Sequence, residues 1–159
     1  MGRTLTERGL TLATSESLTG GLLGATITGV PGASQYYVGG VVVYATEQEA
    51  RIGGVGPAVL RKHGVISEQT AVEMVMGVQE LTGADYALAA SGVAGPAPQE
   101  GHRPGEVWIA VIGPRVGTMQ PSPTALRFQF EGEREPVREQ TVQAALRMLL
   151  DLLDPIKRD

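Results

Sequence analysis

The sequence predicts an α/β protein of the three-layer α/β/α sandwich class, with helices on both faces of a mixed central sheet. Apolar strand patterns alternate with helical patterns through the first two thirds of the chain, which indicates parallel strands joined by helices. Two consecutive strand patterns before a last helix indicate an antiparallel hairpin in the same sheet. With 159 residues, the chain is expected to form a single domain over 1–159.

Glycine and proline divide the first half of the chain into short elements. Val30, Pro31 and Gly32 end the first long helical run. The valine-rich run 37–46 predicts a largely buried strand, and Gly39 and Gly40 within it indicate a bulge or a close backbone approach. The other elements expected here are a polar helical turn over 4–8, a strand over about 10–14, a helix over 22–30 and short helices over 47–52 and about 58–63.

The second half contains clearer helix boundaries. Ser67 is expected to cap a helix whose apolar residues recur at helical spacing, and Gly83 marks its C-terminus. The alternation over 124–131 predicts a strand with one exposed face, and Pro155 is expected to stop the last helix. The other elements expected here are strands over 86–91 and 106–112, a hairpin connection over 113–123 and a helix over about 135–153.

Composition excludes several classes of function. The net charge of −4 argues against general nucleic-acid binding, which needs a basic surface. The chain has no cysteine, which excludes disulfides, a thiol nucleophile and cysteine-based zinc sites, and two histidines cannot supply a three-histidine site. We therefore expect no metal and no cofactor. The absence of a long apolar run and of a signal peptide predicts a cytoplasmic protein that does not bind membranes.

Ligands of such sheets bind at the carboxyl ends of strands, and three loops leave strand ends here. In the first loop, serines and threonines surround Glu16, and Gly20 and Gly21 lead into a helix with Thr19 as its expected N-cap. The free N–H groups at a helix start can hold a phosphate, a carboxylate or a developing oxyanion. The same pattern is also typical of an ordinary polar turn.

The other two loops cover 44–49 and 91–105, and the glycines of the second allow the backbone to approach a ligand closely. Near the C-terminus, Arg134 and Arg138 lie one turn apart at a helix start. This pair can grip a phosphate or a carboxylate. It can equally form ion pairs with the neighbouring glutamates, which are Glu131, Glu133 and Glu135.

Seven short motifs cover nearly the whole chain in a fixed order. They are SESLTGG over 15–21, VPG over 30–32, GGVVVY over 39–44, HGVIS over 63–67, SGVAGP over 91–96, VWIA over 107–110 and FEGER over 130–134. Together they resemble the CinA C-terminal family, the nicotinamide-nucleotide amidohydrolases. The resemblance implies a three-layer α/β/α domain that hydrolyses the amide of nicotinamide mononucleotide to nicotinate mononucleotide and ammonia. It also implies a homo-oligomer.

The resemblance assigns roles to individual residues. Ser17 matches the nucleophilic serine of the family, and Tyr44 matches the tyrosine of the second loop, where it would orient the site. The implied partner is a small-molecule pyridine nucleotide, with no nucleic acid, membrane or cofactor. The residues implied or expected to bind substrate are Glu16, Thr19, Gly20, Gly21, Ser91, Gly92, Gly95, Arg134 and Arg138.

The sequence departs from the family at the expected base, a lysine that follows the tyrosine. Ungapped alignment places Glu49 there, and a gapped alternative places Arg51 there. Arginine stays protonated, whereas a carboxyl group whose pKa is raised by burial can accept a proton. One hypothesis is an amidohydrolase with Ser17 as nucleophile and Glu49 as acid and base. The alternative is a catalytically impaired relative that keeps the fold as a nucleotide-binding or structural domain.

Overall fold

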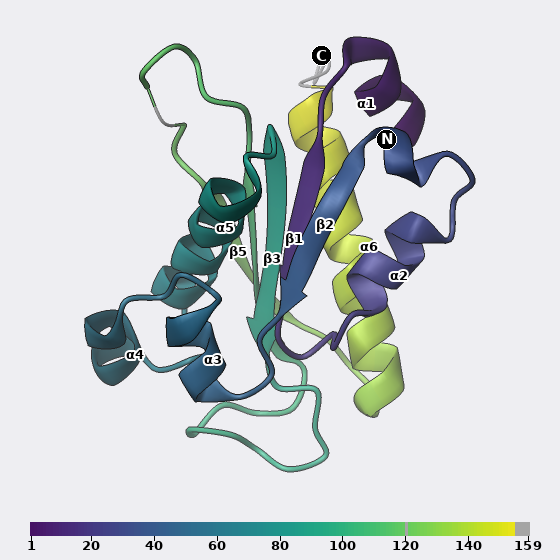
Figure 1. Ribbon diagram of the computed structural model, residues 1–159. Helices are drawn as coiled ribbons and strands as arrows, with labels where there is room; N and C mark the ends of the chain where they lie inside the picture. Colours follow the sequence, from purple (N-terminus) through teal and green to yellow (C-terminus); the bar gives the residue numbers. More distant parts are fainter. Residues whose placement is uncertain (120, 155–159) are drawn as a thin grey trace, which may run out of the picture.

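The computed structural model describes residues 1–119 and 121–154 (Figure 1). Its strands are β1 (Leu12–Glu16), β2 (Tyr37–Val42), β3 (Tyr86–Gly92), β4 (Glu106–Ile112) and β5 (Thr124–Gln129). Its helices are α1 (Gly2–Arg8), α2 (Leu22–Thr28), the short 3₁₀ helix η1 (Ala33–Gln35), α3 (Thr46–Arg51), α4 (Pro57–His63), α5 (Glu68–Thr82) and α6 (Arg134–Leu153).

The strands form one mixed sheet, as predicted. Their order is β2-β1-β3-β4-β5, in which β1 pairs in parallel with β2 and β3, and β4 pairs antiparallel with β3 and β5. Helix α5 packs on one face, with α3 and α4 beside it, and α2 and α6 pack on the other (Figure 1). The predicted α/β class is therefore confirmed.

Strand β3 shows why the sheet is covered on both faces. Its residues are buried without interruption from Tyr86 to Ser91. Leu88 and Ala90 belong to the apolar core beneath α2 and α6, whereas Ala87 and Ala89 belong to the core beneath α5. Successive strand residues point to opposite faces, so a continuous apolar run requires a helix layer on each side.

Helix α5 begins and ends as the sequence predicts. The Ser67 hydroxyl accepts the N–H of Thr70 at 3.2 Å, and Gly83 adopts a left-handed conformation with φ 68° after the last turn. The last helix ends at Leu153, and the predicted stop at Pro155 lies outside the described residues. Within the described chain, no helix is both long enough and apolar enough to cross a bilayer.

Strand β2 corrects one expectation. The run 37–46 was expected to be a largely buried strand, but β2 ends at Val42 and lies at the edge of the sheet, where Val38 and Val42 are about half exposed. The predicted irregularity at the paired glycines is confirmed. The register with β1 shifts beside Gly39, and a Cβ on Gly40 would lie 2.3 Å from Oγ1 of Thr14.

Candidate active site

The carboxyl ends of the three parallel strands meet at one end of the sheet, where they border a cavity of about 100 Å³. The three loops that the sequence singled out all contribute to it. The antiparallel strands contribute none of the lining. The residues that line the cavity are Ser17, Leu18, Tyr44, Thr46, Glu49, Val65, Gly92, Val93, Ala94, Gly95, Ala97, Gln99 and Arg134.

Ser17 and Glu49 come together in this cavity. Ser17 directly follows β1, and its N–H donates to the carbonyl of Ala90 at 3.0 Å, which fixes it between β1 and β3. Glu49 lies on α3 and is only 1% exposed. Burial raises the pKa of its carboxyl group to about 7. The neighbouring Ser17 hydroxyl lowers this pKa in part, and the charge of Glu100 raises it further.

The Glu49 carboxyl group is also incompletely bonded. Its Oε2 is buried and has no hydrogen-bond partner among the described residues. A buried polar oxygen without a partner is energetically costly, and such an oxygen can bond to a ligand or to water or can take part in a reaction. The structure therefore places a group that can take and give a proton near neutral pH beside a serine hydroxyl.

Glu16 has a different surrounding from the one expected. Its carboxylate is buried and accepts hydrogen bonds from the Thr19 hydroxyl at 2.7 Å and from the N–H groups of Gly21, Leu23 and Gly24 at 3.0, 3.0 and 2.8 Å. The Glu16 carboxylate thus accepts the hydrogen bonds of the N–H groups at the start of α2, which have no acceptor within the helix. Thr19 is not the N-cap, because its hydroxyl donates to this carboxylate and α2 begins after Gly21.

The backbone N–H groups that were expected to bind an anion therefore already have acceptors within the protein. Besides the N–H groups bound by Glu16, the N–H of Gly20 donates to the carbonyl of Ser17 at 3.0 Å. Gly20 and Gly21 have φ of 57° and 98°, which lets the chain turn sharply from β1 into α2. Glu16, Thr19, Gly20 and Gly21 shape the turn that presents Ser17, and none of the four lines the cavity.

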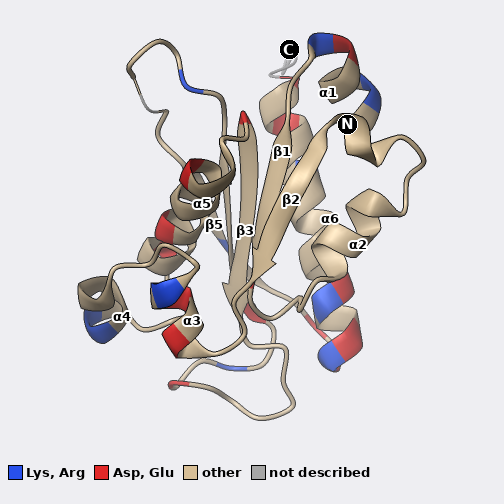
Figure 2. Cartoon of the chain, in the orientation of Figure 1, with Lys and Arg blue, Asp and Glu red and all other residues tan. Residues whose placement is uncertain are grey.

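The two arginines of α6 bond to the segments around the cavity, but only Arg134 lines it. Arg134 donates to the carbonyl of Gly95 at 2.8 Å and to the hydroxyl of Tyr44, which is largely exposed at the cavity mouth. Arg138 donates to the carbonyl of Thr19 at 2.8 Å and forms an ion pair with Glu135 at 2.7 Å. An ion pair with a neighbouring glutamate was one of the two roles that the sequence left open for these arginines. Basic and acidic residues alternate over these first turns of α6 (Figure 2).

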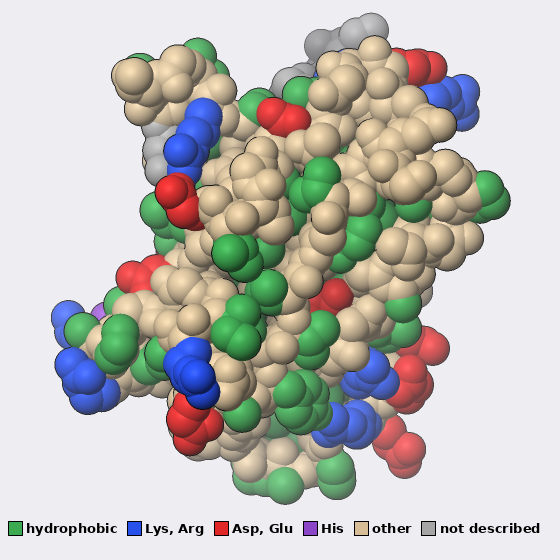
Figure 3. Space-filling view, in the orientation of Figure 1, with side chains coloured by type: hydrophobic (Ala, Val, Ile, Leu, Met, Phe, Trp, Pro, Cys, Tyr) green, Lys and Arg blue, Asp and Glu red, His purple; other side chains and the backbone are tan. Residues whose placement is uncertain are grey.

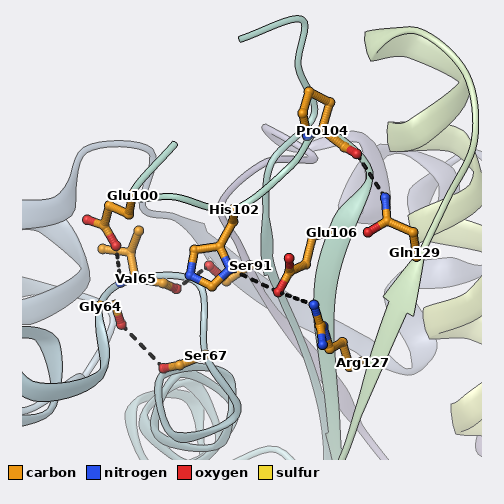
Figure 4. A network of polar contacts seen from close by, with 10 residues as sticks. All are labelled: Gly64, Val65, Ser67, Ser91, Glu100, His102, Pro104, Glu106, Arg127 and Gln129. Atoms are coloured by element: carbon orange, nitrogen blue, oxygen red, sulfur yellow. Dashed lines mark hydrogen bonds and ion pairs between the residues drawn. The ribbon is translucent and has the colours of Figure 1, made fainter. Parts of the chain in front are cut away.

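The loop over 93–105 forms one wall of the cavity. Figure 4 shows the contacts that hold this loop in place. Ser91 is buried and donates to the carbonyl of Val65 at 2.6 Å, so its hydroxyl ties β3 to the α4–α5 connection and does not line the cavity. Gly92 does line it, and a Cβ there would lie 2.5 Å from the carbonyl of Glu106. Only glycine allows this approach of β3 to β4.

Some cavity residues were assigned no role from the sequence. Val65 is apolar and belongs to the HGVIS motif over 63–67, but nothing in that motif placed it near Ser17. Gln99 and its neighbour Glu100 lie in the loop that the sequence did single out, but nothing distinguished them from solvated surface. Among the described residues, no three His, Asp or Glu side chains gather as a metal site would require.

An ion-pair cluster closes the base of this loop. Glu106 accepts from His102 at 2.9 Å and from Arg127 at 3.0 Å, and its side chain is 7% exposed (Figure 4). Burial alone raises the pKa of Glu106, but the hydrogen bonds and charges of His102 and Arg127 together hold it below its ordinary value of 4.5. The folded protein therefore stabilises the carboxylate more than the unfolded chain does.

This cluster predicts a specific dependence of stability on pH. A lowered pKa stabilises the fold above about pH 4.5, and that contribution is lost as the pH falls through the folded-state pKa. We expect wild type to exceed Glu106→Gln in urea midpoint above pH 5, with a difference that shrinks toward pH 3. A difference that stays constant over this range would contradict the assignment.

These features define a class of protein: an α/β domain that carries a serine and a buried carboxyl group in a polar cavity at the carboxyl ends of its parallel strands. A model of the CinA C-terminal domain family matches residues 1–153. The chain belongs to this family.

Charges of both signs are interspersed on the face seen in Figure 3, in keeping with the low net charge.

Individual relatives agree with this assignment. A CinA-like protein of Frankia casuarinae is 42% identical over 94% of this chain, and one of Thermotoga maritima is 39% identical over 92%. The chain spans about a third of the length of these curated relatives, 33% and 35% respectively.

Solved structures show the same domain. A CinA superfamily protein of Klebsiella pneumoniae is 35% identical with a TM-score of 0.88, over 95% of this chain and 91% of that one. A competence or damage-inducible protein of Enterobacter asburiae is 33% identical with a TM-score of 0.89, over 96% and 92%.

Proposed function

We propose that this domain hydrolyses the amide of nicotinamide mononucleotide, with Ser17 as nucleophile and Glu49 as general acid and base. The observation that carries the proposal is the buried Glu49 carboxyl group beside Ser17, with a pKa raised to about 7. A serine hydroxyl is a weak nucleophile and needs a base within hydrogen-bond reach. Glu49 supplies this base at the position where the family has lysine.

The first half of the reaction follows from this pair. Ser17 Oγ attacks the amide carbon while its proton passes to the Glu49 carboxylate, and the carbonyl electron pair moves to the oxygen. The carbonyl then re-forms, the carbon–nitrogen bond breaks, and Glu49 returns the proton to the departing nitrogen. Ammonia leaves and an acyl ester remains on Ser17.

Water completes the cycle with the same two groups. Glu49 takes a proton from the attacking water as its oxygen bonds to the acyl carbon. The ester bond to Ser17 breaks, and Glu49 gives the proton to the Ser17 oxygen. The products are nicotinate mononucleotide and the enzyme in its starting state. A pKa near 7 suits a group that must both accept and donate a proton at neutral pH.

The cavity dimensions bear on how the substrate would lie. At about 100 Å³ the cavity is much smaller than a site for a whole nucleotide, which occupies roughly 300 Å³ or more. We propose that the amide and its ring enter, and that the ribose phosphate extends past Tyr44 toward Arg134. A guanidinium group at the rim can form two parallel hydrogen bonds with a phosphate.

This mechanism predicts the pH dependence of the reaction. Glu49 must be ionised to act as base, so kcat/KM should rise through about pH 7 and be roughly 100-fold lower at pH 5 than at its plateau. The measurement is ammonia release between pH 5 and 9. Glu49→Gln should lower the plateau by about 10²- to 10⁴-fold, because the amide cannot accept the proton. A profile flat down to pH 5 would exclude Glu49 as the base.

One observation favours a second candidate, a nucleotide-binding domain without turnover. The segment after Tyr44 has no lysine, and the ungapped alignment with the family places Glu49 where the resemblance implies the proton-accepting lysine. If this exchange abolished catalysis, wild type would bind nicotinamide mononucleotide without releasing ammonia, and Glu49→Lys would gain activity. Ammonia release by wild type that Glu49→Lys does not improve would exclude this candidate.

A further inference from the structure

We infer that the backbone N–H groups of Leu18 and Ala94 bind the oxygen of the substrate amide as it becomes negatively charged. The inference deepens the proposed function and rests on it, because the attack by Ser17 is what creates this oxyanion. As the Ser17 oxygen bonds to the amide carbon and its proton passes to Glu49, the electron pair of the carbonyl double bond moves to the oxygen. Donors held ready for this charge usually supply a large part of the catalysis.

Five buried residues line the cavity, and their N–H groups differ in whether they have an acceptor. These residues are Leu18, Glu49, Val65, Val93 and Ala94. The N–H groups of Glu49, Val65 and Val93 donate to acceptors at 3.4, 3.0 and 2.9 Å. Those of Leu18 and Ala94 donate to no acceptor among the described residues. Buried N–H groups without an acceptor are rare in proteins, which makes these two the candidates for binding a ligand atom.

The backbone of Leu18 and Ala94 is the part of each residue that faces the cavity. Both side chains pack in the apolar core beneath α2 and α6, yet both residues line the cavity. Only 4% of Leu18 and 5% of Ala94 is exposed. A hydrogen bond to a negative oxygen is stronger in such a setting than in water, because the surroundings screen the charge less.

The two N–H groups border Ser17 from neighbouring strand ends. Leu18 directly follows Ser17 after β1, and Ala94 lies in the segment that leaves β3. The two strands run in parallel with Glu16 opposite Ala90, and the N–H of Ser17 donates to the carbonyl of Ala90. Serine hydrolases of another fold also combine the N–H after the nucleophile with an N–H from a separate loop.

Two adjacent N–H groups are less suited to this role. The N–H of Thr19 has no acceptor among the residues that the structure describes, but Thr19 does not line the cavity. Gly95 lines it but is only partly buried, and its carbonyl is bound by Arg134 at the mouth. Leu18 and Ala94 therefore remain as the pair of donors.

The test replaces one backbone amide by an ester, which removes the N–H and keeps the side chain. In the 159-residue chain, lactic acid takes the place of Ala94 in one variant, and leucic acid takes the place of Leu18 in another. The matched control is lactic acid at Ala58, which is exposed on α4 and does not line the cavity. Its N–H likewise has no acceptor within the described chain.

Pyridine-3-boronic acid provides a probe that does not depend on turnover. The Ser17 oxygen bonds to boron, the hydroxyl proton passes to Glu49, and boron becomes a tetrahedral anion. The O–H bond of the serine is the only bond that breaks. Boron NMR distinguishes the trigonal acid from the tetrahedral adduct and gives the Kd of the adduct.

We expect the esters at Leu18 and Ala94 each to lower kcat for nicotinamide mononucleotide by about 10²- to 10³-fold and to leave KM within roughly threefold. The lost donor acts on the developing charge and not on the bound amide. Affinity for the boronic acid should fall by about 10- to 100-fold. The ester at Ala58 should change neither value. All three esters weaken the preceding carbonyl as an acceptor, so their urea midpoints should fall by similar small amounts.

The two proposals fail in different ways. Equal kcat values for the esters at Leu18, Ala94 and Ala58 overturn the oxyanion assignment even if the wild type is active, and so does a rise in KM with kcat unchanged. Absence of ammonia release from the wild type overturns the proposed function, and the boronic acid then decides about the oxyanion. An adduct that the first two esters weaken supports the assignment. An adduct that they leave unchanged, or no adduct, overturns it.

Discussion

Ser17→Ala is expected to lower ammonia release from nicotinamide mononucleotide by about 10⁴-fold or more. Removing a nucleophile abolishes the covalent path, and what remains is the small acceleration from binding and orientation. The cavity itself should persist, because the N–H of residue 17 and not its side chain bonds to Ala90. The measurement is initial-rate ammonia release at pH 8, where Glu49 is ionised.

The control for this experiment is a serine far from the cavity. Ser34 lies on η1 and is exposed, so Ser34→Ala should keep wild-type activity. Binding of nicotinate mononucleotide to Ser17→Ala, followed by calorimetry, separates a lost reaction from a lost fold. Activity of Ser17→Ala near that of wild type would rule out the serine mechanism and leave Glu49 acting directly on water.

Glu16→Ala is expected to lower the free energy of unfolding by about 3–5 kcal/mol, the largest loss of stability that we predict for a single substitution. The change leaves three N–H groups at the start of α2 and the Thr19 hydroxyl without their acceptor in a buried setting. Urea unfolding followed by circular dichroism measures it. Glu16→Gln keeps one acceptor oxygen and should lose less.

An exposed glutamate provides the comparison for this measurement. Glu80 pairs with Arg115 on the surface, where its side chain is 73% exposed, so Glu80→Ala should change stability by less than about 1 kcal/mol. If Glu16→Ala and Glu80→Ala unfold at the same urea concentration, the four hydrogen bonds of Glu16 do not hold α2 to the sheet.

Most of the architecture could be predicted from the sequence, because local patterns determine it. The alternation of helix and strand patterns identified the mixed sheet, and Ser67 and Gly83 marked both ends of α5. The misplaced element was β2. Its valine-rich run resembles a central strand, and composition cannot show that a strand has a neighbour on one side only.

The site was less predictable, because it depends on contacts between distant residues. The order of the motifs predicted that Ser17 and Glu49 act together. Only the fold shows that the Glu49 carboxyl group on α3 is buried. Glu16 was expected to help bind substrate, and the sequence could not reveal that its hydrogen-bond partners are Thr19 and the N–H groups at the start of α2. The pyridine nucleotide and the homo-oligomer stay predictions.

The position of α6 has a consequence for the order in which the protein is made. Ser17 and Glu49 belong to the first third of the chain, whereas Arg134 and Arg138, which bond to Gly95 and Thr19, belong to its last fifth. A ribosome therefore releases Ser17 and Glu49 before the helix whose arginines bond to the turn and to the loop around them. A nascent chain would therefore carry the serine and the carboxyl group, while the residues that lead to α6 are still being made, before Arg134 and Arg138 can form these hydrogen bonds.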